Sequence, residues 1–166
     1  MMLSPNFSLK EMTQSQTALR LGLDNEPNEE QKENLKQLCL NVLQPLREYY
    51  QNPIKISSGF RSAKLSEAIG SSANSQHCKG EAADFELIGH DNLNVASHIK
   101  NNFQYDQLIL EYYDGTLNSG WIHCSYSSRN NRKMALKKIR TDIRSGYNYG
   151  KHTNTKSFRR RRSYRC

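Results

Sequence analysis

The spacing of apolar residues changes once along this 166-residue chain, and the change constrains the fold more than any other feature. Between residues 28 and 50, apolar residues recur at intervals of three and four, as on one face of an α-helix: Leu35, Leu38, Val42 and Leu46. From residue 53, four segments are predicted as strands, 53–57, 82–87, 106–112 and 121–126, and apolar and polar residues alternate in the first two. Helices followed by strands favour an α+β fold in which an antiparallel sheet packs against N-terminal helices.

Capping residues mark the expected helix ends. Ser8 and Glu11 have the spacing of a capping box, so a short helix is predicted to start there. Asn28 is the expected N-cap of the long helix, which should kink at Pro45 because proline has no N–H for the helical hydrogen bond. Two further helices are predicted, at residues 62–69 and 91–101.

The basic residues are concentrated at the C-terminal end. Residues 129–166 contain fourteen lysines and arginines and one acid, whereas residues 1–128 contain ten lysines and arginines and fifteen acids. A segment with so few apolar and so many like-charged residues cannot form a core of its own. We therefore expect a folded domain over residues 1–128 and a basic C-terminal segment over 129–166, largely disordered after about residue 146.

No apolar run approaches the roughly 18 residues of a membrane-spanning helix. The N-terminus has no basic region followed by an apolar one, so we expect synthesis in the cytoplasm without a signal peptide. The four cysteines, Cys39, Cys78, Cys124 and Cys166, form no CxxC pair and are expected to be free thiols.

Three residues could form a metal site. Asp84 lies between apolar residues at the start of a predicted strand, where a partly buried carboxylate needs a partner. His77 precedes this strand and His123 lies in the last one; two histidines and one carboxylate leave a fourth Zn²⁺ position open, as in catalytic sites. From spacing alone, the histidines could equally cap loops and Asp84 bind a turn. Thiolate ligation by Cys78 or Cys124 is a further alternative.

Three segments, SGFR (58–61), SQHCKGEAADF (75–85) and DQLILE…WIHCSY (106–126), occur in an order that resembles a known family. They are similar to zinc D-Ala-D-Ala carboxypeptidases and phage endolysin peptidases of the hedgehog/DD-peptidase fold. The opening of the chain also looks like the small single-domain branch of this family, so the resemblance covers roughly residues 3–127. It implies a zinc peptidase domain over residues 1–128.

The resemblance implies roles for individual residues. His77, Asp84 and His123 match the three metal ligands, and Arg61 matches an arginine that contacts the substrate carbonyl or carboxylate. A guanidinium suits this role because its planar fork of donors can stabilise a developing oxyanion. The residues assigned to substrate binding are Arg61, Ser75 and Gln107, although Ser75 could equally cap its loop.

The general base is where this chain departs from the family pattern. Several relatives have an acid three residues before the last histidine ligand, and that position here is Gly120. The nearest upstream acids are Glu111, at the end of a predicted strand, and Asp114, in the following turn. The end of the first strand of a hairpin lies beside the start of the second, so Glu111 is the predicted base and Asp114 the alternative.

These expectations combine into a zinc-dependent peptidase acting on the stem peptides of peptidoglycan, as a D-Ala-D-Ala carboxypeptidase or an L-Ala-D-Glu endopeptidase of endolysin type. A zinc-containing cell-wall binding module without catalysis is the alternative. The basic tail is expected to attract anionic polymers of the cell envelope rather than nucleic acid, because no recognition fold for nucleic acid is visible. We expect a monomer.

Overall fold

The computed structural model describes residues 1–138, so the disorder predicted after about residue 146 and most of the basic tail lie outside the described residues. The elements follow in this order: β1 (Met2–Ser4), β2 (Phe7–Ser8), α1 (Leu9–Thr13), α2 (Gln16–Leu21), α3 (Glu29–Leu38), the π-helix η1 (Cys39–Leu43), α4 (Gln44–Tyr50), β3 (Ile54–Ser58), α5 (Ala63–Ala68), the 3₁₀-helix η2 (Gln76–Lys79), β4 (Ala82–Leu87), α6 (Asn92–Asn102), β5 (Gln107–Glu111), β6 (Trp121–Ser125) and β7 (Met134–Lys138).

The predicted α+β architecture is confirmed, but the sheet is mixed rather than wholly antiparallel. Five strands lie in the order β3-β4-β6-β5-β7, and β7 runs parallel to β5 while the other pairs are antiparallel. The chain after β6 returns to the start of β5, where the N–H of Lys133 donates to the carbonyl of Tyr105. It therefore enters the sheet at the same end as β5, which makes the pair parallel. The boundary predicted after residue 128 precedes β7, so the sheet continues to Lys138.

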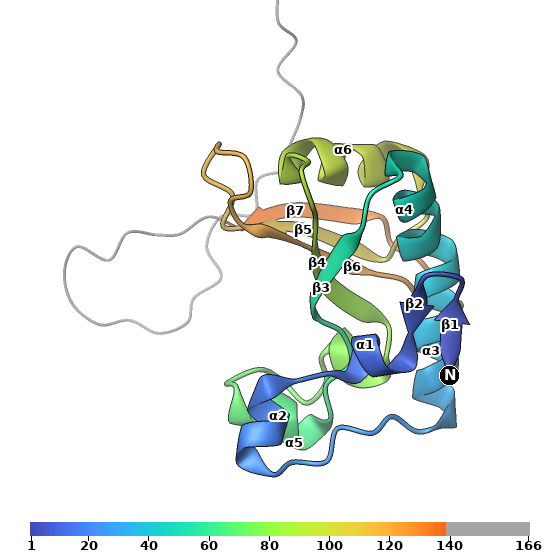
Figure 1. Ribbon diagram of the computed structural model, residues 1–166, viewed down its shortest axis with the longest axis vertical. Helices are drawn as coiled ribbons and strands as arrows, with labels where there is room; N and C mark the ends of the chain where they lie inside the picture. Colours follow the sequence, from blue (N-terminus) through green and yellow to red (C-terminus); the bar gives the residue numbers. More distant parts are fainter. Residues whose placement is uncertain (139–166) are drawn as a thin grey trace, which may run out of the picture.

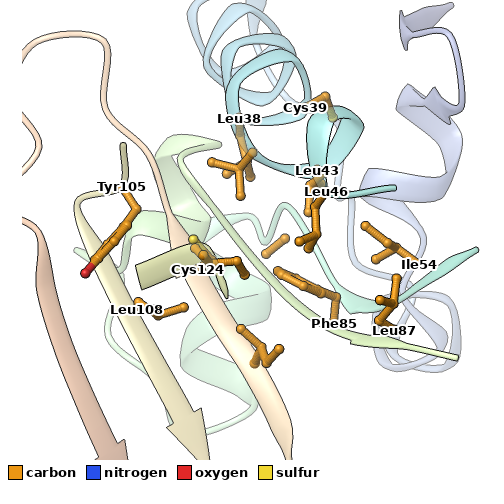
Figure 2. Packing of buried hydrophobic residues seen from close by; sticks show 14 of the residues in the cluster. Leu38, Cys39, Leu43, Leu46, Ile54, Phe85, Leu87, Tyr105, Leu108 and Cys124 are labelled. Atoms are coloured by element: carbon orange, nitrogen blue, oxygen red, sulfur yellow. The ribbon is translucent and has the colours of Figure 1, made fainter. Parts of the chain in front are cut away.

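One face of the sheet packs into the core. Leu38, Leu43 and Leu46 of the helical segment α3–η1–α4 approach Phe85 and Cys124 of the sheet (Figure 2). Helix α6 adds Val95, Ala96 and Ile99 to the same core. In Figure 1, α6 lies above the sheet, whereas α1, α2 and α5 lie below it. The core therefore uses both the predicted N-terminal helices and α6.

Helix starts follow the predicted caps. The Ser8 hydroxyl accepts a hydrogen bond from the N–H of Glu11, and Asn28 forms a complete capping box with Gln31. The expected irregularity at Pro45 takes the form of the π-helical turn η1 directly before it. Proline has no N–H to bond the carbonyl four residues earlier, and a π turn accommodates such a mismatch within a continuous helix.

The β1–β2 hairpin and helix α2 were not predicted. The two strands span three and two residues, which is too short for a period of 2 to be read from the sequence, and α2 spans six residues. None of the helices in residues 1–138 is long and apolar enough to cross a membrane. The three cysteines of these residues are free thiols, as predicted, and burial raises the pKa of Cys39 to about 12.

Asp106, directly before β5, connects three parts of the chain. Its buried carboxylate accepts hydrogen bonds from Nε of Arg132 at 2.7 Å and from Nε2 of Gln76 at 2.9 Å. These bonds attach η2 and the segment before β7 to the start of β5. The hydrogen bonds from Arg132, assisted by that from Gln76, lower the pKa of Asp106 to about 2.

Replacing Asp106 with Asn should lower the free energy of unfolding at pH 7 by about 1–3 kcal/mol, because a buried charge-assisted network is lost. The pKa is lower in the folded chain than the value of about 3.9 expected when unfolded. The ionised carboxylate therefore stabilises the fold above the unfolded value, and this contribution is lost as the pH falls towards about 2. Urea unfolding at pH 7 and at about pH 2.5, near the lower end of this window, should show a much smaller wild-type advantage at the lower pH. An equal advantage at both values would contradict the assignment.

Candidate metal centre

Three potential ligand atoms from separate elements converge on one point. His77 comes from η2, Asp84 from β4 and His123 from β6, and their nearest ligand atoms all lie within 4.8 Å of one another. Nε2 of His77 lies 3.3 Å from Nδ1 of His123 and 3.2 Å from Oδ1 of Asp84. Nδ1 of His123 lies 2.8 Å from the same carboxylate oxygen. The residues predicted as ligands are therefore brought together.

The pairing of β4 with β6 produces half of this cluster. Asp84 and His123 are direct partners across the antiparallel ladder, so both side chains project from the same face of the sheet. Phe85 and Cys124, one residue further along each strand, project into the core on the opposite face. The alternation predicted for both strands therefore agrees with the structure.

Helix η2 brings His77 over this pair. The Ser75 hydroxyl accepts a hydrogen bond from the N–H of His77 and caps the helix. At the other end, the side-chain amides of Gln31 and Asn34 in α3 donate to the carbonyls of Cys78 and Lys79. Helix α3 thus fixes the short helix that carries His77.

A backbone carbonyl sets the tautomer of His77. Nδ1 lies 2.7 Å from the carbonyl oxygen of Gly59, and because a carbonyl only accepts, Nδ1 must carry the proton. The lone pair of Nε2 then faces His123 and Asp84. Histidine ligands commonly bond an outer carbonyl in this way, which fixes the ring and directs the free nitrogen at the metal.

The spacing of the cluster fits a small divalent cation. Donors at about 2.0–2.1 Å from a tetrahedral Zn²⁺ lie about 3.3 Å from one another. The two distances from Nε2 of His77, 3.3 and 3.2 Å, match this separation closely. Two nitrogens and one carboxylate oxygen are also a donor set that Zn²⁺ accepts. The residues present therefore fit a metal ion.

Charge in the cluster is arranged as a metal site requires. Burial lowers the pKa of His77 below its usual value, despite the opposing influence of Asp84, so the ring is neutral near pH 7 and can ligate. Burial alone would raise the pKa of Asp84, but hydrogen bonds with His123 and His77 outweigh it and hold the pKa well below its usual range. Asp84 is therefore an anion.

Arg61 lies against this carboxylate on the side of the cluster away from the histidines. Its terminal nitrogen donates to Oδ2 of Asp84 at 3.2 Å, and its Nε is buried without a hydrogen-bond partner among the described residues. Arg61 also lines a groove of about 570 Å³ with Ser57 and Phe60. Arg61 therefore lies between the carboxylate of the cluster and this groove.

A larger cavity than this groove lies elsewhere. A space of about 1000 Å³ between α3, η2 and residues 127–132 has none of the three cluster residues in its lining. Two of the amide side chains that line it, those of Gln31 and Asn34, bond the carbonyls of η2. Chemistry, rather than volume, therefore identifies the candidate site.

The two predicted bases differ in environment. Glu111 pairs with Trp121, two residues before His123, and Ile109 of the same strand pairs with His123 itself. The Glu111 side chain thus projects from the face of the sheet that carries His123, and it is only 13% exposed. Asp114 lies in the following turn, where its carboxylate accepts from both the N–H and the hydroxyl of Thr116.

The other predicted residues take structural positions. Ser75 caps η2, the backbone of Gln107 exchanges hydrogen bonds with the Ser125 hydroxyl, and neither contact decides their predicted roles with substrate. Cys124 is buried in the core, and the thiol of Cys78 points to the carbonyl of Ser72 rather than joining the cluster. Thiolate ligation therefore has no support from the geometry.

Two features of the site were missed by the sequence analysis. Gly59 supplies the carbonyl that orients His77, and Lys138 of β7 donates to Glu111 at 3.1 Å. The position of Gly59 within SGFR was the available signal for the first. Lys138 had none, because a lysine within a basic segment cannot be told from its neighbours by spacing.

Gly120 explains why no acid stands three residues before His123. Its φ is +64°, and a Cβ at this position would lie 2.1 Å from the carbonyl oxygen of Glu111. The backbone of Glu111 thus occupies the space that a side chain would need. The predicted base, Glu111, lies on the neighbouring strand β5.

Changing Gly120 to Ala should lower the free energy of unfolding by about 2 kcal/mol or more, because strain from the positive φ adds to the contact with the Glu111 carbonyl. Gly22 is the matched control, since it has the same φ of +64° but no atom within 4 Å of an added Cβ. Urea unfolding should therefore show a smaller loss for Gly22→Ala. Equal losses for the two variants would mean that the close approach at Gly120 costs nothing.

The chain was compared with known proteins. A family model described as Peptidase M15 matches residues 5–125, a range that includes Arg61 and all three cluster residues. No curated protein matches the chain.

Proposed function

The chain belongs to the peptidase M15 family, and we propose that it is a zinc-dependent peptidase that hydrolyses the stem peptides of bacterial peptidoglycan. The observation that carries the proposal is the convergence of His77, Asp84 and His123 within 4.8 Å, on the face of the sheet that Glu111 shares. A metallopeptidase needs these parts together: a metal site with an open position and an acid beside it.

Three atoms would hold the metal ion: Nε2 of His77, Oδ1 of Asp84 and Nδ1 of His123. Bound there, Zn²⁺ would supply Lewis-acid activation of water and of the scissile carbonyl. The second oxygen of Asp84 stays with Arg61, which keeps the carboxylate oriented with a single oxygen towards the cluster. The Gly59 carbonyl does the same for His77.

Glu111 and Arg61 would perform the remaining chemistry. Glu111 takes the proton from the attacking water and delivers it to the leaving amine, which allows the peptide bond to break without a free amide anion. Arg61, whose Nε has no partner in the described residues, stabilises the negative charge that develops on the carbonyl oxygen or binds a substrate carboxylate. Ser75 and Gln107 remain predicted substrate contacts.

Two bonds of the stem peptide are candidates, D-Ala-D-Ala and L-Ala-D-Glu. The basic C-terminal segment favours an enzyme of phage endolysin type, and the segments 58–61, 75–85 and 106–126 resemble those of the hedgehog/DD-peptidase fold. We propose that the basic tail is attracted non-specifically to anionic polymers of the envelope, because residues 129–166 contain fourteen lysines and arginines and one acid.

Incubating the protein with purified peptidoglycan should release soluble fragments, and a chelator should abolish the release. Mass spectrometry identifies the bond: release of single D-alanine indicates the carboxypeptidase, whereas release of peptides that begin with D-Glu, with L-Ala left on the glycan, indicates the endopeptidase. Added Zn²⁺ should restore release after chelation. Protein that contains zinc but releases no fragments would instead be a binding module of the same fold.

Replacing Glu111 with Gln should leave the zinc content unchanged but lower kcat/KM by roughly 100-fold or more, because proton transfer loses its base. Asp114→Asn is the matched comparison, since it removes the other candidate carboxylate. A large loss at Asp114 with near-normal turnover at Glu111 would reverse the assignment. Zinc content by atomic emission and rates on soluble muropeptides give both readouts.

A further inference from the structure

Strand β7 lies beyond the part of the chain that the family model matches, yet it reaches the candidate site. The match ends at residue 125, and β7 spans Met134–Lys138 at the edge of the sheet. Its register with β5 pairs Glu111 with Lys138. Because partners in a ladder share a face of the sheet, Lys138 lies on the face that carries Glu111.

The two side chains make a direct ion pair. Nζ of Lys138 donates to Oε2 of Glu111 at 3.1 Å. The Glu111 side chain is 13% exposed and that of Lys138 is 50% exposed, so the acid is the more buried partner. A pair exposed on one side adds little to stability. The ion pair matters instead for orientation. A glutamate side chain has three rotatable bonds, and the contact with Lys138 selects one orientation of the carboxylate.

Lys138 is itself held in place. Its carbonyl accepts a hydrogen bond from the N–H of Tyr112 at 2.8 Å, and its ammonium lies 4.9 Å from the centre of the Tyr112 ring. The Tyr112 ring in turn packs at 5.0 Å from that of Trp121, the strand partner of Glu111. Tyr112 has a φ of +54°, so the chain turns sharply just after Glu111. The ammonium is therefore fixed relative to both strands beside Glu111.

We infer that Lys138 is a positioning residue of the peptidase site, which holds the carboxylate of Glu111 in the orientation required to take the proton of the attacking water. The inference rests on the proposed function, since it requires that Glu111 is the base. The second oxygen of the carboxylate, Oε1, stays available for the proton, because Lys138 engages Oε2. The basic C-terminal segment thus contributes one residue, Lys138, beside the proposed base.

Lys137 provides a matched control for charge. It is the neighbour of Lys138 in β7 but pairs with Leu110, whose side chain is buried on the opposite face. Its ammonium lies 5.2 Å from the centre of the Tyr113 ring. Replacing either lysine removes one positive charge and one cation–π contact from the same strand, but only replacing Lys138 removes the contact with Glu111.

The experiment compares Lys138→Met, Lys138→Arg and Lys137→Met in the full-length zinc-loaded protein, with soluble muropeptides as substrate. Lys138→Met should lower kcat roughly 10-fold, because a misplaced base loses part of its contribution. Apparent KM, zinc content and the urea midpoint should change little. Lys138→Arg should recover most of kcat, and Lys137→Met should match the wild type.

Combining Lys138→Met with Glu111→Gln separates a positioning effect from a general one. If Lys138 acts through Glu111, the double variant should be no slower than Glu111→Gln alone. Wild-type or increased kcat for Lys138→Met, beside an inactive Glu111→Gln, would overturn the inference and leave the proposed function intact. An equal loss for Lys137→Met would also overturn it. Full turnover by Glu111→Gln would instead remove the base from the proposed function, and the inference with it.

Discussion

The structure depends on the antiparallel pairing of β4 with β6. That pairing sets Asp84 opposite His123, so two ligand atoms approach within 2.8 Å before any loop contributes. Two polar side chains so close together on a sheet would be costly without further partners. His77, Arg61 and the carbonyl of Gly59 supply them, and each of these is held by a part of the chain outside the two strands.

The surrounding fold explains how a small protein keeps such a cluster in place. Helix α3 packs Leu35 and Leu38 into the core and, one turn earlier on the same face, bonds η2 through Gln31 and Asn34. The helix that carries His77 is therefore fixed to the same core that supports β4 and β6. Sites built on regular elements in this way hold their geometry more accurately than sites built on free loops.

Neighbouring side chains orient the carboxylates of Asp84 and Glu111. Asp84 is shared by two histidines and an arginine, which keeps it ionised and aimed at one point. Glu111 receives Lys138 from β7, beyond the range of the family match. A side chain at residue 120 would collide with the backbone of Glu111. The close approach of Glu111 to Gly120 therefore excludes an acid at residue 120.

The sequence alone predicted four strands of the main sheet and the helix caps, because alternation and capping are local properties of neighbouring residues. Its resemblance to a known family implied the ligands of the cluster, which spacing left open. Strand Ala82–Leu87 and the N-cap at Asn28 appear as expected. Only the tertiary structure decided that β7 joins the sheet parallel to β5, that Lys138 meets Glu111, and that Gly59 orients His77. These contacts join residues 18 to 27 positions apart. They depend on strand register and on packing across the core, which no periodicity in the sequence records.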